Sequence, residues 1–175
     1  MNDETERVIL VDTDDNQVGT VPKLEAHRAG RLHRAFSVFV RNSSGEILLQ
    51  KRADGKYHSS GLWTNTCCGH PRPGETTVDA ARRRLFEELG ITCGVLKPAG
   101  VYRYRAEIRD LVENELDHLF VTEVDGEPVP DPDEVVEYRF IAVDELDAWI
   151  AAEPEAFTAW FPPAWAIARA AIERA

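Results

Sequence analysis

One helix and the loop before it constrain the fold of this chain more than any other segment. Apolar residues recur on one helical face: Val78, Ala81, Leu85 and Leu89. This spacing predicts an amphipathic helix over Thr77–Leu89, with Thr76 or Thr77 as its cap and Gly90 as its end. The other faces carry four charges: Arg83, Arg84, Glu87 and Glu88. The chain must therefore bury one side of this helix against a partner and turn the charged side toward solvent or a site.

Several β-like segments precede and follow this helix. We expect strands at residues 8–11, 36–40, 47–50, 101–106, 116–124 and 135–141. Residues 42–45 should close a hairpin, 12–16 a turn, and 125–134 a surface loop. Two further helices are expected, at residues 143–152 and from about Pro162 to Arg174. These elements predict an α+β fold with helices packed on a mixed or antiparallel sheet.

Length and composition limit the class of protein. A chain of 175 residues, 43% of them hydrophobic, fits one domain spanning 1–175. A net charge of -11 repels the nucleic-acid backbone, so an anionic ligand needs a local basic cluster or metal ions. Residues 1–7 are polar and no stretch approaches the ~18 apolar residues of a membrane span. We therefore expect a cytoplasmic protein without a nucleic-acid or membrane partner. Its three cysteines, Cys67, Cys68 and Cys93, form no disulfide framework, so we expect reduced thiols.

A longer pattern starts at Gly69. It reads Gly69, five residues, Glu75, seven residues, and then Arg-Arg-Leu-Phe-Glu-Glu-Leu-Gly-Ile at positions 83–91. This resembles the Nudix box, which has a glycine, a glutamate six residues on, and a helix that ends Arg-Glu-apolar-any-Glu-Glu-any-Gly-apolar. A loop-to-helix transition of this kind places carboxylates on a rigid element where they can hold Mg²⁺. Among the fixed positions only Arg84 departs from the box, where a glutamate is usual, and this argues against ordinary Nudix hydrolysis.

The charged face of the helix also allows a simpler interpretation. Arg83 with Glu87, and Arg84 with Glu88, are pairs four residues apart that stabilise many solvent-exposed helices. The box favours a functional role for Glu88, while Glu87 fits either interpretation equally well.

A second set of residues offers nitrogen and oxygen ligands: His27, His33, His70, Glu113 and Glu115. On a strand the two glutamates point to the same side, roughly 7 Å apart along the chain, so one ion can take both. Three imidazoles and two carboxylates suit a divalent transition metal such as Mn²⁺ or Zn²⁺. For any single histidine a surface or core role is the commoner one, and spacing alone identifies no site.

A second resemblance covers nearly the whole chain. The matching pieces are Ala-His at 26–27, Arg-Leu-His-Arg-Ala-Phe-Ser at 31–37, Trp-Thr-Asn at 63–65, Cys-Gly-His-Pro at 68–71, Tyr-Arg-Tyr-Arg at 102–105, Val-Glu-Asn-Glu at 112–115 and Ala-Phe-Thr-Ala-Trp at 156–160. In combination they are similar to the type I isopentenyl-diphosphate isomerases, a Nudix-fold family. These enzymes interconvert isopentenyl and dimethylallyl diphosphate.

The resemblance implies a role for each matching position. The metal ligands fall on His27, His33, His70, Glu113 and Glu115. The catalytic cysteine falls on Cys68, with Cys67 as a neighbour without that role. Tyr104 matches the tyrosine beside the catalytic Glu115, and Trp160 matches a tryptophan that lines the substrate pocket. Glu88, with the backbone of Cys68, matches the Mg²⁺ site. Diphosphate-binding positions fall on Lys23, Arg52, Lys56 and Arg84, so the residue that breaks the hydrolase box fits the isomerase.

The reaction explains why these residue types are needed. Moving a double bond requires an acid and a base in a dry pocket. Glu115, with Tyr104 in support, is suited to be the acid, and Cys68 to be the base, because nearby cations and metal favour its thiolate. The intermediate tertiary carbocation would be stabilised by the face of Trp160, by roughly 2 kcal/mol or more when desolvated. Each of these side chains also has a common structural role, as a buried cysteine, core tryptophan or strand tyrosine.

Two other functions remain open at this point. A Nudix hydrolase of a nucleoside or other diphosphate would need Glu87 and Glu88 but not Cys68. A regulatory Nudix-like domain that binds a ligand without turnover would leave the acid, base and metal residues unexplained. The isomerase interpretation predicts a small diphosphate substrate, Mg²⁺, and one tightly bound Mn²⁺ or Zn²⁺. It leaves open whether the chain is a monomer or a homodimer.

Overall fold

A computed structural model of the protein describes residues 6–56 and 58–174. In chain order its elements are β1 (Arg7–Val11), β2 (Gln17–Pro22), α1 (Lys23–Ala29), β3 (His33–Arg41), β4 (Ile47–Arg52), β5 (Trp63–Thr64), β6 (Cys67–Gly69), α2 (Thr77–Leu89), β7 (Lys97–Ile108), β8 (Leu111–Glu123), β9 (Val135–Ile141), α3 (Val143–Ala152), a 3₁₀ turn at Pro154–Ala156, and α4 (Phe161–Glu173). The predicted α+β class is confirmed, as are the turn at 12–16 and the loop at 125–134.

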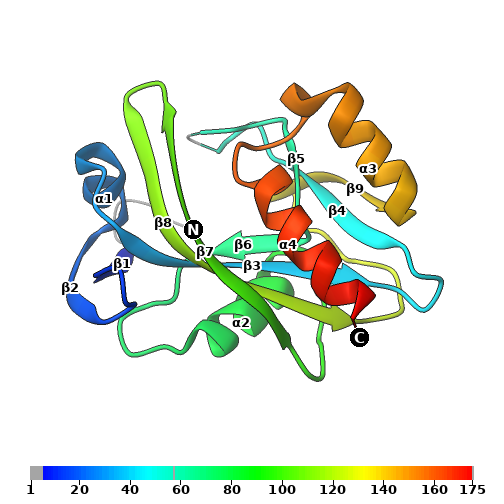
Figure 1. Ribbon diagram of the computed structural model, residues 1–175, viewed down its shortest axis with the longest axis horizontal. Helices are drawn as coiled ribbons and strands as arrows, with labels where there is room; N and C mark the ends of the chain where they lie inside the picture. The colour runs from blue at the N-terminus through cyan, green and yellow to red at the C-terminus, as the bar shows by residue number, and fades with distance from the viewer. Residues whose placement is uncertain (1–5, 57, 175) are drawn as a thin grey trace.

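The strands form a mixed sheet with β3 at its centre. β3 pairs antiparallel with β1, β4 and β6, and parallel with β8 over nine residues, from His33 opposite Glu115 to Arg41 opposite Glu123. β7 and β8 form a long antiparallel hairpin that crosses the molecule (Figure 1). The parallel β3–β8 pairing is what brings the N-terminal third of the chain beside Glu113 and Glu115.

Side chains of β3 alternate between two hydrophobic layers. Phe36, Val38 and Val40 pack with the buried side of α2, whereas Phe39 packs with α3 and α4. Figure 1 shows α2 on one side of the sheet and α4 lying across β7 and β8 on the other. The core is therefore two layers separated by one sheet.

Helix α2 has the bounds that its apolar spacing predicts. The Thr76 hydroxyl accepts a hydrogen bond from the backbone N–H of Asp79 at 3.1 Å, so Thr76 is the cap. Gly90 adopts the left-handed conformation, with φ of 64°, and ends the helix. Leu85 and Leu89 are fully buried, as expected for the face that meets the sheet.

The sequence prediction missed four short elements: β2, α1, β5 and β6. β5 and β6, with two and three residues of strand, and α1, with seven of helix, are too short to show a period. β2 has six residues, but none of them is fully buried, so it has no apolar alternation. It also began β8 five residues late, because Glu113, Glu115 and Asp117 are charged residues on the buried side of a strand. Such residues are normally a signal for a surface loop.

Among the described residues, no helix is long and apolar enough to cross a membrane. The polar start of the chain lies mostly outside the described part, since residues 1–5 are not included in it.

Candidate active site

One pocket collects most of the predicted site residues. Those that line it are Lys23, Arg52, Lys56, Cys68, His70, Arg84, Glu88, Tyr104, Glu113, Glu115 and Trp160. His27 and His33 lie behind this wall and are fully buried. The structure therefore brings all the predicted residues to one place, although they come from eight separate segments of the chain.

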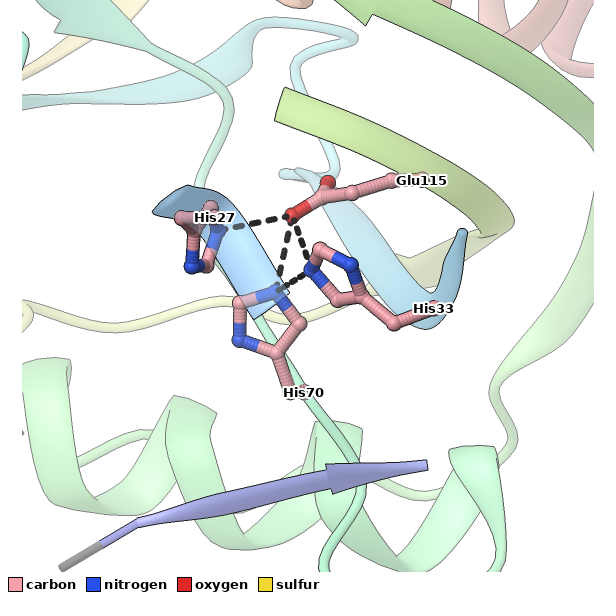
Figure 2. Close-up of side chains that lie close together, drawn as sticks. All are labelled: His27, His33, His70 and Glu115. Atoms are coloured by element: carbon pink, nitrogen blue, oxygen red, sulfur yellow. Dashed lines mark hydrogen bonds and ion pairs between the residues drawn. The ribbon is translucent and has the colours of Figure 1, made fainter. Parts of the chain in front are cut away.

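Three histidines surround one carboxylate oxygen of Glu115. The distances from its Oε1 to the Nε2 atoms are 3.8 Å for His27, 3.4 Å for His33 and 2.8 Å for His70. Figure 2 shows these contacts converging on the same oxygen. The Nε2 atoms of His33 and His70 lie only 3.2 Å apart. Two nitrogen lone pairs at this distance repel unless a proton or a cation lies near both.

Backbone carbonyls fix the tautomers of two of these rings. Nδ1 of His27 lies 2.8 Å from the carbonyl oxygen of Lys23, and Nδ1 of His33 lies 2.8 Å from that of Arg31. A carbonyl only accepts hydrogen bonds, so Nδ1 carries the proton in both rings. In the neutral ring, Nε2 then points its lone pair at the cluster, which is the arrangement that metal-binding histidines use.

The charges in this cluster perturb one another strongly. Burial disfavours the charged form of His27, but contacts with Glu113 and Glu115 raise its pKa to about 10. Burial lowers the pKa of His70. Burial alone would raise the pKa of Glu115, yet the surrounding histidines hold it well below its usual range. Glu115 is therefore a carboxylate at neutral pH, and its charge is balanced within a buried site.

Tyr104 connects the two glutamates. Its hydroxyl lies 3.3 Å from Oε2 of Glu113 and 3.1 Å from Oε2 of Glu115. Both carboxylates therefore point to the same side of β8, as predicted from strand geometry. Burial raises the pKa of Tyr104 well above its usual value, so the hydroxyl keeps its proton and donates.

The adjacent cysteines of β6 face opposite layers. Cys67 is fully buried against the α2 side of the core, and Cys68 lines the pocket next to Ser37 of β3. Burial raises the pKa of Cys68 to about 12, despite the opposing effect of Arg52. This is the opposite of the thiolate expected from the sequence. The reason is that Glu88 and Glu115 add negative charge to a site already poorly solvated.

Trp160 forms the aromatic wall of the pocket and is 4% exposed. Its backbone carbonyl accepts a hydrogen bond from the Tyr102 hydroxyl at 3.0 Å, and its indole N–H points at Asn65 Oδ1, 3.3 Å away. The guanidinium of Arg52 lies over the ring, 5.4 Å from its centroid. The ring is thus held on several sides, and one side already faces a cation.

Three of the four predicted diphosphate-binding cations already contact carboxylates. Lys23 lies 2.9 Å from Glu6, Lys56 contacts Glu134, and Arg84 contacts Glu88 and Glu134. Because Arg84 and Glu88 are both buried, their four-residue spacing is part of the pocket, not the decoration of an exposed helix face. Arg83 with Glu87 is the more exposed pair, at 3.1 Å.

Glu88, the predicted Mg²⁺ ligand, has both oxygens in contact with donors. Oε1 accepts from Arg84, and Oε2 accepts from the side-chain amide of Gln50 at 2.8 Å. Glu75, the first glutamate of the box, accepts two hydrogen bonds of 2.8 Å from Arg83 and one from the backbone N–H of Arg72. It therefore joins the loop to α2 and does not line the pocket.

Comparison with known proteins agrees with this arrangement. The NUDIX domain family matches residues 31–161. The isopentenyl-diphosphate Delta-isomerase of Burkholderia multivorans is 55% identical to this chain over 157 residues, which cover 89% of each protein. That of Streptomyces coelicolor is 48% identical over 176 residues, which cover 98% of this chain and 88% of the relative. This chain belongs to the isopentenyl-diphosphate Delta-isomerase family. The resemblance drawn from its motifs is confirmed.

Solved structures of other proteins show the same fold. DR0079 from Deinococcus radiodurans superposes with a TM-score of 0.70 at 24% identity, over 84% of this chain and 90% of that one. A MutT NUDIX hydrolase from Burkholderia pseudomallei gives 0.62 at 22% identity, over 76% and 95%. This chain therefore shares its fold with these proteins, one of which is a NUDIX hydrolase.

Four pocket residues that lie outside the matched motifs were missed by the sequence analysis: Glu6, Gln50, His58 and Glu134. Gln50 could have been found, because it lies on a predicted strand two residues after Leu48, and residues two apart on a strand point to the same side. Glu6, His58 and Glu134 sit outside regular elements, where no period indicates which way a side chain points.

Proposed function

We propose that this chain interconverts isopentenyl and dimethylallyl diphosphate, by adding a proton at one carbon and removing one at another. The observation that carries this proposal is the content of one pocket. An acid pair, Glu115 with Tyr104, shares it with a thiol, Cys68, and with an aromatic wall, Trp160. A hydrolase that breaks a phosphate bond needs neither the tyrosine, nor the thiol, nor the aromatic wall.

The histidine cluster fits a divalent transition metal such as Mn²⁺ or Zn²⁺. Its ligands would be His27, His33, His70, Glu113 and Glu115, and the inward Nε2 lone pairs support this. An ion bound there would balance the carboxylates and increase the acidity of a carboxyl group attached to it. Mg²⁺ would be held at Glu88 with the backbone of Cys68 and would bind diphosphate oxygens.

Four cations lie in the same pocket to bind the diphosphate: Lys23, Arg52, Lys56 and Arg84. Although burial opposes the charged form of Arg84, Glu88 and Glu134 raise its pKa, so it stays a guanidinium. The carboxylates that contact these cations keep them charged and oriented without a ligand. Five glutamates line the same pocket, so these cations need bound metal ions beside them to attract a diphosphate to a protein of net charge -11.

The reaction needs a protonated acid, Glu115, on one side of the substrate and a deprotonated base, Cys68, on the other. From isopentenyl diphosphate, the π electrons of C3–C4 take the proton of a Glu115 carboxyl group and form a C4–H bond, while the Tyr104 hydroxyl contacts Glu115. Glu115 is a carboxylate in the protein without ligands, so it must gain this proton before the step. The tertiary cation at C3 faces Trp160, and the buried pocket excludes water that would trap it. Cys68 as thiolate then removes a proton from C2, and that C–H electron pair becomes the C2–C3 double bond. Burial keeps the proton on Cys68 in the protein without bound ions, so this thiolate needs the charge of Arg52 together with that of the Mg²⁺ that would be held beside the Cys68 backbone.

The test is to incubate the protein with Mg²⁺ and isopentenyl diphosphate in D₂O. Dimethylallyl diphosphate carrying deuterium is the expected product, detected by NMR. Release of inorganic phosphate or pyrophosphate is followed in the same tube. Phosphate release without isomer would support the hydrolase alternative, and no label in a fully metallated sample would refute the isomerase proposal.

Several finer features belong to the same proposal. They are a cytoplasmic location, the choice between a monomer and a homodimer, a single domain spanning 1–175, and the absence of nucleic-acid partners.

A further inference from the structure

His58 lies at the junction of the metal cluster and the aromatic wall, and the proposed mechanism gives it no role. It comes from the loop between β4 and β5, which also carries Lys56. Its side chain is 9% exposed and lines the pocket. A buried imidazole that faces a reaction site from a loop calls for a functional explanation.

The first contact of His58 is with Glu113. Its Nε2 atom lies 2.9 Å from Oε1 of that carboxylate. The other oxygen, Oε2, faces Nε2 of His27 at 3.3 Å and the Tyr104 hydroxyl at 3.3 Å. The two oxygens of Glu113 thus point in different directions, one toward the cluster and one toward His58. A contact on the outer oxygen fixes the rotation of the carboxylate and so the aim of the inner one.

The second contact is with Trp160. The two ring centroids are 6.0 Å apart and the planes cross at 87°, an edge-to-face arrangement. The backbone carbonyl of His58 also accepts a hydrogen bond of 3.4 Å from Arg52, whose guanidinium lies over Trp160. One residue therefore contacts the metal cluster with its nitrogen, the aromatic wall with its ring, and a diphosphate-binding cation with its carbonyl.

We infer that His58 is a positioning residue that orients Glu113 for the metal from outside the coordination sphere and buttresses Trp160 at the same time. This inference rests on the metal centre in the proposed function. The ligand atoms of His27, His33, His70 and Glu115 form one compact group, and those of His27, His58 and Glu113 form a second group that shares His27. An outer position is favoured because His58 contacts Oε1 of Glu113, whereas Oε2 of Glu113 is the oxygen that faces His27. His58 acts on the cluster through Oε1 of Glu113, the oxygen that points away from the cluster.

Two substitutions separate the two contacts. His58→Phe keeps a ring beside Trp160 but removes the nitrogen that meets Glu113. His58→Gln keeps a nitrogen at similar reach but removes the ring. His118→Gln is the matched control, because His118 lies on the same strand as Glu113 yet contacts Asp15 at 3.0 Å and does not line the pocket.

The experiment loads each protein with Co²⁺, records its visible absorption bands, and measures loss of the ion to a chelator. We expect His58→Phe to hold Co²⁺ about 10- to 100-fold less tightly with unchanged band positions, since only a group outside the ligands is lost. We expect His58→Gln and His118→Gln to retain the ion like the parent protein. His58→Gln should lower kcat about 10-fold with little change in KM, because the ring that supports Trp160 is lost.

Each other outcome counts against the inference. Equal retention by His58→Phe would refute the positioning role, and shifted absorption bands would make His58 a direct ligand. If the parent protein binds no Co²⁺, the proposed metal centre itself fails. If the parent protein binds Co²⁺ and His58→Phe retains it equally well, this inference fails but the proposed metal centre stands. Thermal melting of the metal-free proteins checks that both His58 variants fold.

Discussion

Cys67 and Cys68 are chemically identical neighbours in opposite environments. Strand alternation turns Cys67 into the layer beneath α2 and Cys68 into the pocket. Only Cys68 can therefore meet a substrate carbon without unfolding β6. The family resemblance indicates the same residue, because Cys68 immediately precedes Gly69 and His70. The structure gives the physical reason, since Cys68 is the cysteine that faces the pocket.

We predict that Cys68→Ala lowers the rate of dimethylallyl diphosphate formation by about 10²- to 10⁴-fold, the range for loss of a general base. Cys67→Ala should retain most of the rate but lower the free energy of unfolding by about 1 kcal/mol, because it leaves a small cavity in the core. Initial rates and urea unfolding measure the two effects. The reverse pattern of rates would move the base to Cys67.

The site was predictable to the extent that its residues stand in motifs. Every predicted residue except the two buried histidines lines the pocket, and those two contact its wall. Glu6, His58 and Glu134 were not predictable, because their positions depend on how loops fold over the sheet. The raised pKa of Cys68 was not predicted, since burial and carboxylate charges do not appear in a motif.

At the scale of elements, α2 depends on the loop that precedes it. Glu75 accepts hydrogen bonds from Arg83 on the helix and from the backbone of the loop. The contact with Arg83 lowers the pKa of Glu75, so the folded protein binds this proton less tightly than the unfolded chain. Its contribution to stability is therefore complete above pH ~4.5 and is lost as the pH falls through the lower, folded-state pKa.

We predict that Glu75→Gln lowers the free energy of unfolding by about 1 kcal/mol at pH 7, a modest value for a partly exposed pair. The difference between the variant and the parent should shrink as the pH falls from ~5 to ~3. Urea unfolding at several pH values measures it.

Glu107→Gln is the control, because its ion pair with Arg105, at 3.2 Å, is more than half exposed. It should unfold like the parent at every pH. A difference for Glu75→Gln that stays constant with pH would show that the charge of Glu75 is not the cause.

The elements themselves were predictable where one face is apolar. α2, α3 and β9 have the predicted bounds, because a helix or strand that packs on a core must repeat its apolar residues. The first part of β8 was not, because its buried positions hold Glu113, Glu115 and Asp117. These carboxylates are tolerated inside only because histidines, Tyr104 and Ser37 contact them.

At the scale of the whole molecule, several charged groups are concentrated at one buried centre. We predict that prolonged treatment with a strong chelator lowers both isomerase activity and the melting temperature, and that Mn²⁺ or Zn²⁺ restores both. An ion present at 100 to 1,000 times its Kd adds about 3 to 4 kcal/mol to the stability of the folded state. Calorimetry and elemental analysis measure the two changes.

The effect should weaken in acid, because protons compete with the ion for the Nε2 atoms of the histidines. His27→Gln is the comparison, since it removes one ligand and should melt at nearly the same temperature with and without chelator. Full activity and an unchanged melting temperature in chelator-treated parent protein, shown by elemental analysis to be metal-free, would contradict the prediction.

The register of β3 against β8 has a consequence for how the protein is made. His33 lies opposite Glu115, so the cluster closes only when a segment near the start of the chain meets one from its second half. A growing chain leaves the ribosome at about 5 to 20 residues per second, N-terminus first. All five ligands therefore emerge before Trp160, which completes the pocket wall from just ahead of α4. The proposed metal ligands are thus all synthesised before the residue that completes the pocket wall.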